Sequence, residues 1–259
     1  MARRTIAGLR TIVTGASSGI GRELVLQLVR EQACVVAVAR REERLRELAA
    51  ELSAGDRLVT LPGDVTVAAT RAAAIDMCRS RFGGLDALVN NAGSGAVGPF
   101  AAADPDRLRQ VMELNFFAAV EFIREALPAL RAGKQPIIVN VSSVLGHRAI
   151  PGMSEYCASK FALHGFSDSL RAELTSDRID VLLVSPSTTA SEFFDQAVGD
   201  RSTLTKRFGA MPAAAVARKT IQALRAGRHE IILTPGGKLL VWLDRLCPPI
   251  MNRLIARFG

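Results

Sequence analysis

Hydrophobic residues along the chain fall into short continuous runs and not into an alternating pattern. Seven such runs occupy residues 10–14, 34–39, 58–61, 87–90, 137–141, 181–184 and 231–233. A strand that is buried on both faces needs apolar side chains at consecutive positions, because neighbouring side chains point to opposite faces. The runs therefore predict strands in the middle of a layered structure.

Longer segments in which apolar residues recur at helical spacing separate these runs. They occupy residues 21–30, 42–52, 66–81, 105–130, 155–174 and 212–226. Asp104 and Pro105 make a favourable start for the fourth helix. Strands that alternate with helices predict an α/β fold with a Rossmann-type doubly wound parallel sheet. We expect a single domain over 1–259, with a core at about 8–235, a substrate lid at about 188–211 and a helical C-terminal extension at 236–259.

Composition narrows the range of partners. The 259 residues carry a formal net charge of +8. The basic residues are scattered and no nucleic-acid motif accompanies them, so nucleic acid is not an expected partner. Cys34, Cys78, Cys157 and Cys247 lack the spacing of a metal site or a disulfide framework, and we expect no bound metal. The first strand begins almost at once, without a signal-peptide segment, which favours the cytoplasm.

A glycine-rich loop joins the first predicted strand to the first predicted helix. It reads Thr-Gly-Ala-Ser-Ser-Gly-Ile-Gly over residues 14–21. Glycine permits a tight turn, and the backbone N–H groups at the start of a helix favour a phosphate. The loop predicts a dinucleotide site. The predicted contacts are Gly15, Ser17, Ser18, Gly19, Ile20 and Gly21.

The second predicted strand ends at two arginines, Arg40 and Arg41. In folds of this kind, a residue about twenty positions after the glycines reads the adenosine ribose. A carboxylate there would bind the 2′-hydroxyl of NAD, whereas a guanidinium suits the 2′-phosphate of NADP. The pair therefore predicts NADP(H) as the cofactor, although each arginine also fits the solvated start of a charged helix.

Polar residues and glycine also follow the third and fourth strands, as Gly-Asp-Val at 63–65 and Asn-Asn-Ala-Gly at 90–93. Ligands of open α/β sheets bind beyond the carboxyl ends of the strands. The two amides and the glycine of the second segment suit a ribose and an adenine, while Asp64 is also suited to cap the following helix. The predicted cofactor contacts are Asp64, Val65, Asn91, Ala92 and Gly93.

A candidate catalytic group follows the fifth strand. Tyr156 is the only tyrosine of the chain, and Lys160 lies four residues later on the same side of the predicted helix. An ammonium at about 4 Å favours the phenolate and lowers the tyrosine pKa by up to about three units. Tyr156 is therefore a candidate general acid/base, and Ser143 is a candidate for holding the substrate oxygen.

Taken together, these segments resemble the short-chain dehydrogenase/reductase (SDR) family. The resemblance covers about residues 8–235 and rests on TGASSGIG, NNAG, VNVSS and YCASK in that order. It implies that Ser143, Tyr156 and Lys160 are catalytic, that Tyr156 and Lys160 also contact the cofactor, and that Asn115 supports Lys160 through water.

One segment departs from the family's pattern. After the sixth strand, Ser187 and Ser191 stand where a glycine and a threonine are usual. Hydroxyl groups remain there for the carboxamide of the cofactor. The resemblance therefore still implies cofactor contacts at Pro186, Thr188 and Ser191.

We expect an NADP(H)-dependent oxidoreductase that interconverts a carbonyl and an alcohol on a small to medium lipophilic substrate. One alternative is a 3-ketoacyl-thioester reductase, because a basic surface suits an acidic carrier protein. A second is a non-catalytic NADP(H)-binding regulator, against which the complete catalytic set argues. The apolar residues of the lid do not identify the substrate. They are Phe193, Phe194, Leu204, Phe208 and Met211.

Three further expectations concern surfaces. The family implies a homodimer or homotetramer that pairs through the helices at 105–130 and 155–174, and His147 is expected at the surface. The tail at 236–259 combines apolar residues at near-helical spacing with basic ones, and it is too short and too charged to span a bilayer. It either packs over the cleft or a neighbouring subunit, or lies in a membrane interface with Trp242 at the boundary.

Overall fold

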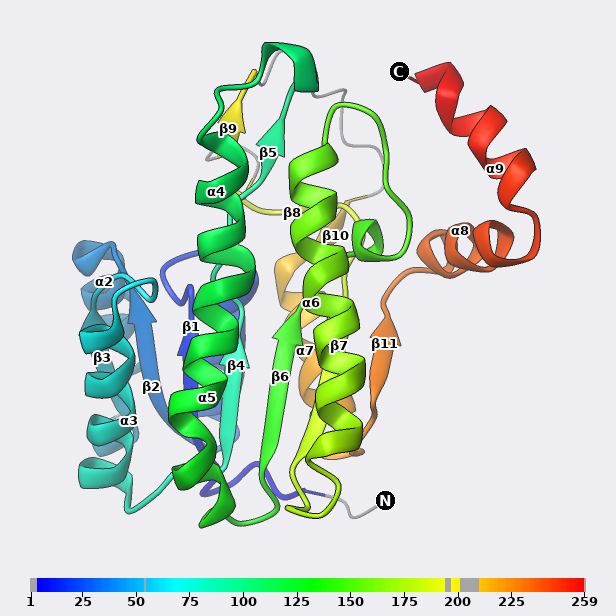
Figure 1. Cartoon of the computed structure of the whole chain (residues 1–259). Helices are drawn as coiled ribbons and strands as arrows, with labels where there is room; N and C mark the ends of the chain where they lie inside the picture. The colour runs from blue at the N-terminus through cyan, green and yellow to red at the C-terminus, as the bar shows by residue number, and fades with distance from the viewer. Residues whose placement is uncertain (1–3, 54, 194–196, 201–209, 259) are drawn as a thin grey trace.

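A seven-stranded parallel sheet forms the centre of the computed structural model, which describes residues 4–53, 55–193, 197–200 and 210–258 (Figure 1). The strand order is β11-β7-β6-β4-β1-β2-β3. The strands are β1 (Arg10–Thr14), β2 (Cys34–Ala39), β3 (Leu58–Pro62), β4 (Ala87–Asn90), β6 (Ile137–Val141), β7 (Asp180–Ser185) and β11 (Glu230–Ile232). The predicted α/β fold and its seven core strands are confirmed.

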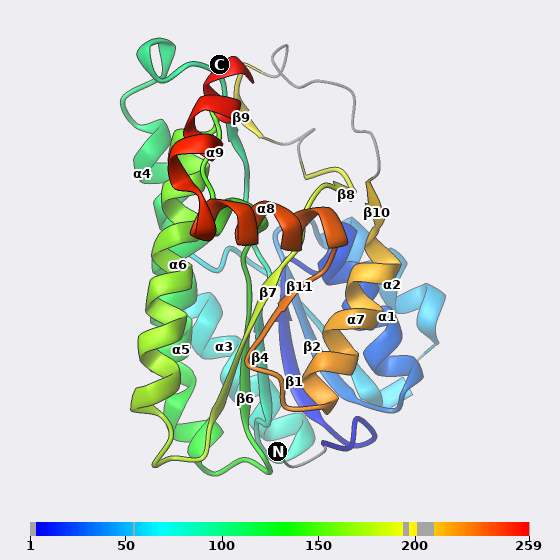
Figure 2. The ribbon, with the colours of Figure 1, turned by 90° about the vertical axis from the view of Figure 1, so that its right-hand side faces the viewer.

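Helices cover both faces of this sheet (Figure 2). One face carries α1 (Gly19–Arg30), α2 (Glu42–Leu52) and α7 (Ala213–Arg225), and the other carries α3 (Ala68–Phe82), α5 (Ala118–Arg131) and α6 (Ser154–Glu173). The neighbouring residues Ile12 and Val13 belong to opposite hydrophobic cores, and both are fully buried. Burial on both sides explains why the strand segments are continuously apolar.

The helix predicted over 105–130 is interrupted in the structure. It consists of α4 (Arg107–Met112), a π-helical turn (Glu113–Phe117) and α5. Asp104 and Pro105 precede the helix in a turn, in which the Asp104 carboxylate accepts a hydrogen bond from the Asp106 N–H at 2.8 Å. The prediction that Asp104 caps this helix is therefore wrong. The helix begins two residues later than predicted, because the Asp104 carboxylate closes the preceding turn. A π turn inserts one extra residue into a helix and often marks a functional site.

Short elements outside the main sheet lie near the carboxyl ends of its strands. Strand β5 (Ala96–Val97) pairs with β9 (Val198–Gly199), and β8 (Thr189–Ala190) pairs with β10 (Met211–Pro212). Single 3-10 turns occur at Gly55–Arg57, Phe100–Ala102, Val144–Gly146 and Ala256–Phe258. Within the predicted lid, Phe194, Leu204 and Phe208 lie outside the described residues.

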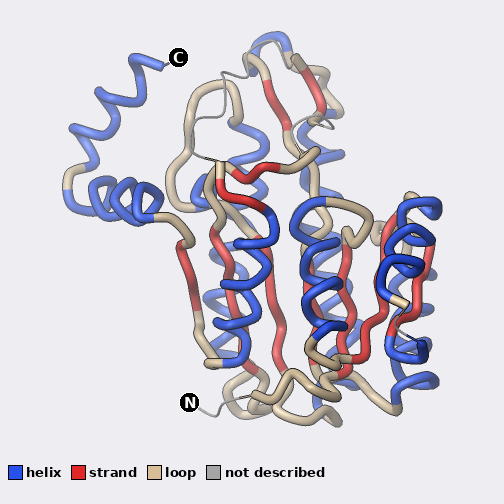
Figure 3. Tube along the Cα trace, turned by 180° about the vertical axis from the view of Figure 1, so that it is seen from behind, coloured by secondary structure: helices blue, strands red, loops and turns tan. Residues whose placement is uncertain are grey.

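The C-terminal extension forms two helices, α8 (Pro235–Leu246) and α9 (Pro248–Ile255), that project from the body beyond the edge strand β11 (Figures 1 and 3). Thr234 caps α8 by accepting a hydrogen bond from the Gly237 N–H at 3.0 Å. Among the described residues, no helix has the length and apolar character needed to cross a membrane. The large apolar side chains exposed on these helices are Leu239, Trp242, Leu243, Leu246, Ile250 and Leu254.

Arg4 joins the N-terminal segment to parts of the chain that follow much later. Its guanidinium donates to the Gln135 carbonyl at 2.7 Å and forms an ion pair with Asp180 at 2.5 Å. The Arg4 backbone N–H donates to the Arg225 carbonyl at 2.9 Å, at the end of α7. The Arg4 side chain is only 5% exposed, so this arginine acts as an internal clamp.

Candidate active site

The predicted site residues gather around one large cavity at the carboxyl ends of the strands. Its volume is about 1440 Å³, and it extends from Arg40 at one end to Tyr156 and Leu240 at the other. Every residue predicted to contact cofactor or substrate lines this cavity, apart from Gly21 and Asn115. Residues from widely separated parts of the sequence thus meet in one place, although their roles stay predictions.

Gly21 supports the glycine loop from behind the cavity. A Cβ on Gly21 would lie 2.3 Å from the Gly15 carbonyl oxygen and 2.4 Å from Asn91 Nδ2. Asn91 Nδ2 in turn donates to the Thr14 carbonyl at 2.9 Å. Close packing of helix, loop and strand therefore requires glycine at position 21.

The two asparagines of the Asn-Asn segment lie in different surroundings. Asn91 lines the cavity and braces the glycine loop. Asn90 is buried and donates to Asn140 Oδ1 at 3.0 Å, away from the cavity lining. The expectation that both amides face the ribose and adenine is therefore wrong for Asn90, because a strand turns adjacent side chains in opposite directions.

The glycine loop suits a diphosphate. Gly15 and Gly19 have φ angles of +67° and +55°, which favour glycine. Helix α1 begins at Gly19, and Ser18 at its N-cap makes no side-chain hydrogen bond to the first turn. The N–H groups of that turn are thus left without a side-chain cap at the cavity wall, where an anion is stabilised.

Two arginines lie at the adenosine end of the cavity and differ in their contacts. The Arg40 side chain is 67% exposed and reaches Asp64 at 4.0 Å. Arg41 crosses to the glycine loop, where it donates to Ser17 Oγ at 3.2 Å and Ser18 Oγ at 2.5 Å. Arg41 also pairs with Glu192 at 2.9 Å, a contact that the sequence pattern did not indicate. Both side chains line the cavity, and Arg40 is the more exposed and less engaged of the two.

Asp64 is not a cap of α3, which begins four residues later. Its Oδ1 accepts hydrogen bonds from the N–H and the hydroxyl of Thr66, at 3.0 and 2.9 Å. This local turn holds Asp64 and Val65 at the cavity wall, where the sequence predicted them. The turn also explains why α3 starts two residues later than predicted.

Ser143, Tyr156 and Lys160 meet at the opposite end of the cavity. Ser143 begins the 3-10 turn Val144–Gly146, and its hydroxyl is hydrogen-bonded to the Tyr156 phenol. Lys160 Nζ donates to the Val141 carbonyl at 3.0 Å and lies 5.8 Å from the centre of the Tyr156 ring. All three side chains are buried, yet all three line the cavity.

Burial controls the protonation of this group. It raises the pKa of Tyr156 above its ordinary value, and the hydrogen bond with Ser143 offsets only part of that effect. Burial also lowers the pKa of Lys160 to about 8. The expected lowering of the tyrosine pKa by Lys160 is therefore wrong for the protein without cofactor, because desolvation disfavours both charges. The phenol is protonated at neutral pH.

Asn115 lies behind this group, in the π-helical turn. Its side chain accepts from the Ser94 N–H at 2.8 Å and donates to Ser159 Oγ at 2.9 Å. A Cβ built on Gly93 would lie 3.0 Å from Asn115 Oδ1 and 3.7 Å from Lys160 Nζ. Asn115 thus fixes the 93–94 loop beside Lys160, which is compatible with the water-mediated support that the resemblance implies.

Apolar side chains surround the Tyr156 end of the cavity. The Phe193 ring makes an edge contact with the Tyr156 ring, with centroids 5.7 Å apart. The C-terminal helices contribute Leu240 and Ile255 to the lining. These two contacts agree with the expectation that the tail packs over the cleft, and Thr234-Pro235 is a recognisable helix start before α8. Further apolar lining comes from Leu145, Ile150 and Met153.

Two polar residues of this region differ from expectation. Ser187, at the position where glycine is usual, exchanges a hydrogen bond with Thr234 Oγ1 at 2.9 Å, so its hydroxyl ties the loop to the start of α8. His147 was expected at the surface, but its side chain is only 3% exposed. It packs under α6 and against β7, because the turn after Ser143 folds inward.

Comparison with known proteins is consistent with this site. Residues 10–201 match the short chain dehydrogenase family. The chain is 28% identical to the ketoacyl reductase HetN of Nostoc sp., over 98% of this chain and 91% of that protein. It is 33% identical to 11-beta-hydroxysteroid dehydrogenase A of Sesamum indicum, over 95% of this chain and 74% of that protein.

Solved structures agree in fold. A short chain dehydrogenase from Burkholderia cenocepacia in complex with NADP superimposes with a TM-score of 0.82 and 27% identity, covering 98% of this chain and 99% of the other. A short chain dehydrogenase/reductase from Burkholderia phymatum in complex with NAD has a TM-score of 0.87 at 23% identity, covering 95% and 96%. The chain belongs to the short-chain dehydrogenase/reductase family of oxidoreductases.

Proposed function

We propose that this protein is an NADP(H)-dependent oxidoreductase that interconverts a carbonyl and an alcohol on a small to medium lipophilic substrate. The observation that carries the proposal is the convergence of Ser143, Tyr156 and Lys160 at one end of the cavity. The apolar residues around Tyr156 support a lipophilic substrate. Arg40 and Arg41, at the other end, support NADP(H) over NAD(H).

Each residue of the group has a distinct task in this proposal. The Ser143 hydroxyl holds the substrate oxygen, and the Tyr156 phenol donates its proton to that oxygen during reduction. The Lys160 ammonium stabilises the phenolate that remains, and Asn115 positions the loop beside Lys160. When bound, the cofactor supplies or accepts the hydride. A protonated phenol is the form of Tyr156 that can donate a proton to the carbonyl oxygen.

The cofactor itself would be held by three groups of residues. The glycine loop and the first turn of α1 would bind the diphosphate, and Arg40 and Arg41 would bind a 2′-phosphate. Pro186, Thr188 and Ser191 line the cavity on the side where the carboxamide is expected.

A spectrophotometric screen tests the reaction class. Oxidation of NADPH is followed with ketones, aldehydes, quinones, steroids and 3-ketoacyl thioesters, and each rate is compared with the rate with NADH. The HetN relative favours ketoacyl thioesters as a second candidate, and the net charge of +8 suits an acidic carrier. A rate that is confined to carrier-bound thioesters would replace the lipophilic-ketone proposal with that one. Absence of turnover with every class would contradict both.

Arg40→Ala should weaken NADPH binding by about 10-fold to 150-fold, because it removes a charge-assisted contact of roughly 1.5–3 kcal/mol. NADH lacks the 2′-phosphate, so its affinity should barely change. Fluorescence titration of both cofactors measures the two dissociation constants.

Arg46→Ala is the matched control for this prediction. Arg46 lies on α2, pairs with Glu42 and Glu43 and does not line the cavity. Its loss should leave both affinities unchanged. Equal affinity of the unmodified protein for NADH and NADPH would refute the cofactor preference.

Removal of residues 237–259 should impair the use of a lipophilic substrate, because Leu240 and Ile255 line the cavity. It should also abolish sedimentation with phosphatidylserine-containing vesicles if the exposed apolar face lies in a membrane interface beside Lys238, Arg245 and Arg253. Solubility, vesicle sedimentation and activity are measured in parallel.

A point variant separates the two faces of the tail. Trp242→Ser with Leu246→Ser changes the exposed face alone, whereas Leu240→Ala changes the cavity face. Lost sedimentation with retained activity in the first variant would favour a membrane. No change in any measurement after removal of 237–259 would exclude both the membrane and the cleft as its place of action.

We also propose that the protein forms a homodimer or homotetramer in the cytoplasm. Leu108, Phe117 and Phe161 are large apolar residues on α4, the π turn and α6, and each is more than 40% exposed. A shared surface on these helices would bury them. Sedimentation velocity of the full chain gives the mass that tests this assembly.

A further inference from the structure

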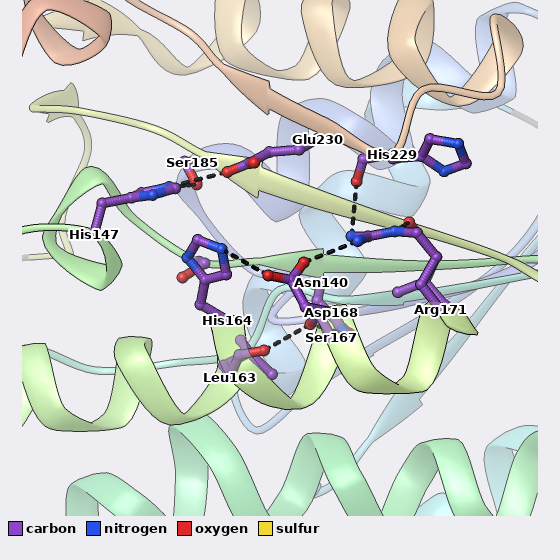
Figure 4. A network of polar contacts seen from close by, with 12 residues as sticks. Asn140, His147, Leu163, His164, Ser167, Asp168, Arg171, Ser185, His229 and Glu230 are labelled. Atoms are coloured by element: carbon purple, nitrogen blue, oxygen red, sulfur yellow. Dashed lines mark hydrogen bonds and ion pairs between the residues drawn. The ribbon is translucent and has the colours of Figure 1, made fainter. Parts of the chain in front are cut away.

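Two of the three histidines of the chain meet a carboxylate outside the cavity. His147 follows the 3-10 turn Val144–Gly146, His164 lies in the middle of α6, and Glu230 begins the edge strand β11 (Figure 4). The two imidazole rings stand edge to face with centroids 4.3 Å apart, and His147 Nε2 lies 3.0 Å from Glu230 Oε1. One donor atom from each residue can be chosen so that all three lie within 4.8 Å of one another.

This cluster holds polar atoms that its own contacts do not satisfy. The His147 side chain is 3% exposed, and its buried Nδ1 has no hydrogen-bond partner among the described residues. Buried Glu230 Oε1 likewise makes no well-directed hydrogen bond, although it lies beside the ring. Buried polar atoms without a partner are costly and uncommon. A cation bound between Glu230 Oε1 and a ring nitrogen of His147 would give that carboxylate oxygen a partner.

The surroundings favour a cation as well. Asp168 lies 3.3 Å from His164 and adds a second carboxylate, which also pairs with Arg171 at 2.8 Å. Ser185 Oγ lies 3.0 Å from His147 Nε2, so the orientation of that ring is already fixed by a neighbour.

We propose that His147, His164 and Glu230 form a binding site for a divalent transition metal of the zinc class. Two imidazoles and one carboxylate are a common zinc ligand set that leaves a fourth position for water. Imidazole ligands disfavour Mg²⁺ and Ca²⁺. Ligands of a tetrahedral zinc ion stand about 3.4 Å apart, so the side chains need to close by only about 1 Å.

The position of the site defines what the metal would do. It would join the turn after Ser143 and helix α6, which are neighbours in the sequence, to the edge strand β11, which follows much later. Glu230 is 33% exposed at the edge of the sheet, which gives the ion a route from solvent. None of the three residues lines the cavity, so the metal would have a structural role and the proposal does not rest on the proposed reaction.

The test uses the full chain with its affinity tag removed, stripped with a chelator and then titrated with Zn²⁺ alone by calorimetry. Cys247 is exposed, so a Cys247→Ser background removes its thiol as a competing ligand. We expect one Zn²⁺ per chain with a micromolar or tighter Kd, and a Tm raised by at least about 5 °C at 100 times Kd. Co²⁺ in place of Zn²⁺ should give visible absorption of a tetrahedral site without a thiolate charge-transfer band.

Two variants test the ligands, and a third is their control. His164→Gln and Glu230→Gln keep the size of each side chain and should each raise the Kd at least about 10-fold. His229→Gln, at the remaining histidine of the chain, should leave it unchanged, because its ring points away from the cluster (Figure 4). Far-UV circular dichroism shows whether each variant is folded. The cobalt spectrum is measured on the parent chain, so it tests the site even if a variant does not fold. Absence of stoichiometric binding, a Kd unaffected by His164→Gln and Glu230→Gln, or an equal loss in His229→Gln would overturn the proposal.

Discussion

Replacement of Tyr156 by phenylalanine should lower the turnover number at least about 10²-fold, the lower end of what a general acid/base contributes. The substitution keeps the ring that packs against Phe193 and removes only the hydroxyl that is hydrogen-bonded to Ser143. Without that hydroxyl, the substrate oxygen has no proton donor in reach. The measurement is kcat with NADPH and the best substrate of the screen, together with the NADPH dissociation constant, which should barely change.

Cys157→Ala provides a control on the same turn of α6. Cys157 is buried next to Tyr156 but does not line the cavity, so its loss should leave kcat within a few-fold of the parent value. If Tyr156→Phe reduced turnover no more than Cys157→Ala does, Tyr156 would not be the proton donor, and the proposed chemistry would be wrong.

The second large effect concerns stability, at the ion pair between Arg107 and Glu155. Arg107 Nε donates to Glu155 Oε2 at 2.8 Å, and each side chain is only 4% exposed. Arg107→Met leaves a buried carboxylate without its partner, which should lower the free energy of unfolding by about 3–5 kcal/mol. Urea unfolding followed by circular dichroism measures this change.

Arg46→Met is the matched control, because Arg46 forms ion pairs on the exposed side of α2, where such pairs contribute about 0–1 kcal/mol. The double variant Arg107→Met with Glu155→Met should recover part of the lost stability, since it removes both buried charges. If Arg107→Met were as stable as Arg46→Met, the pair between Arg107 and Glu155 would not stabilise the fold. Glu155 immediately precedes Tyr156, so a loss of the pair should also disturb the start of the helix that carries the catalytic group.

Local patterns in the sequence predicted most of the fold because each one reports a local physical requirement. The strand at residues 34–39 and the helix at 42–52 have the same bounds in the structure as in the prediction. The interruption of the helix at 113–117 was not predictable in this way. Asn115 in this turn accepts a hydrogen bond from the Ser94 N–H, a contact that forms only when the chain has folded.

The same distinction applies to the site. The glycine loop and the Tyr156–Lys160 pair are contiguous segments, so their chemistry is visible in the sequence, and both line the cavity. The direction in which Asn90 points, the reach of Arg41 to Ser18 and the inward position of His147 are tertiary contacts. The pKa of Tyr156 was misjudged for the same reason, because burial cannot be read from the spacing of two residues.

The clamp at Arg4 has a consequence for the order in which the chain can fold during synthesis. Its backbone partner, Arg225, leaves the ribosome 221 residues later, about 10–45 s at ordinary elongation rates. Strand β1 similarly waits for β4, since Thr11 pairs with Ala87. Until then, the edge of β1 that becomes the middle of the sheet is open to pairing with other chains. A nascent chain of this protein is therefore open to such pairing until β4 has emerged, and its N-terminal segment stays unanchored until α7 has emerged.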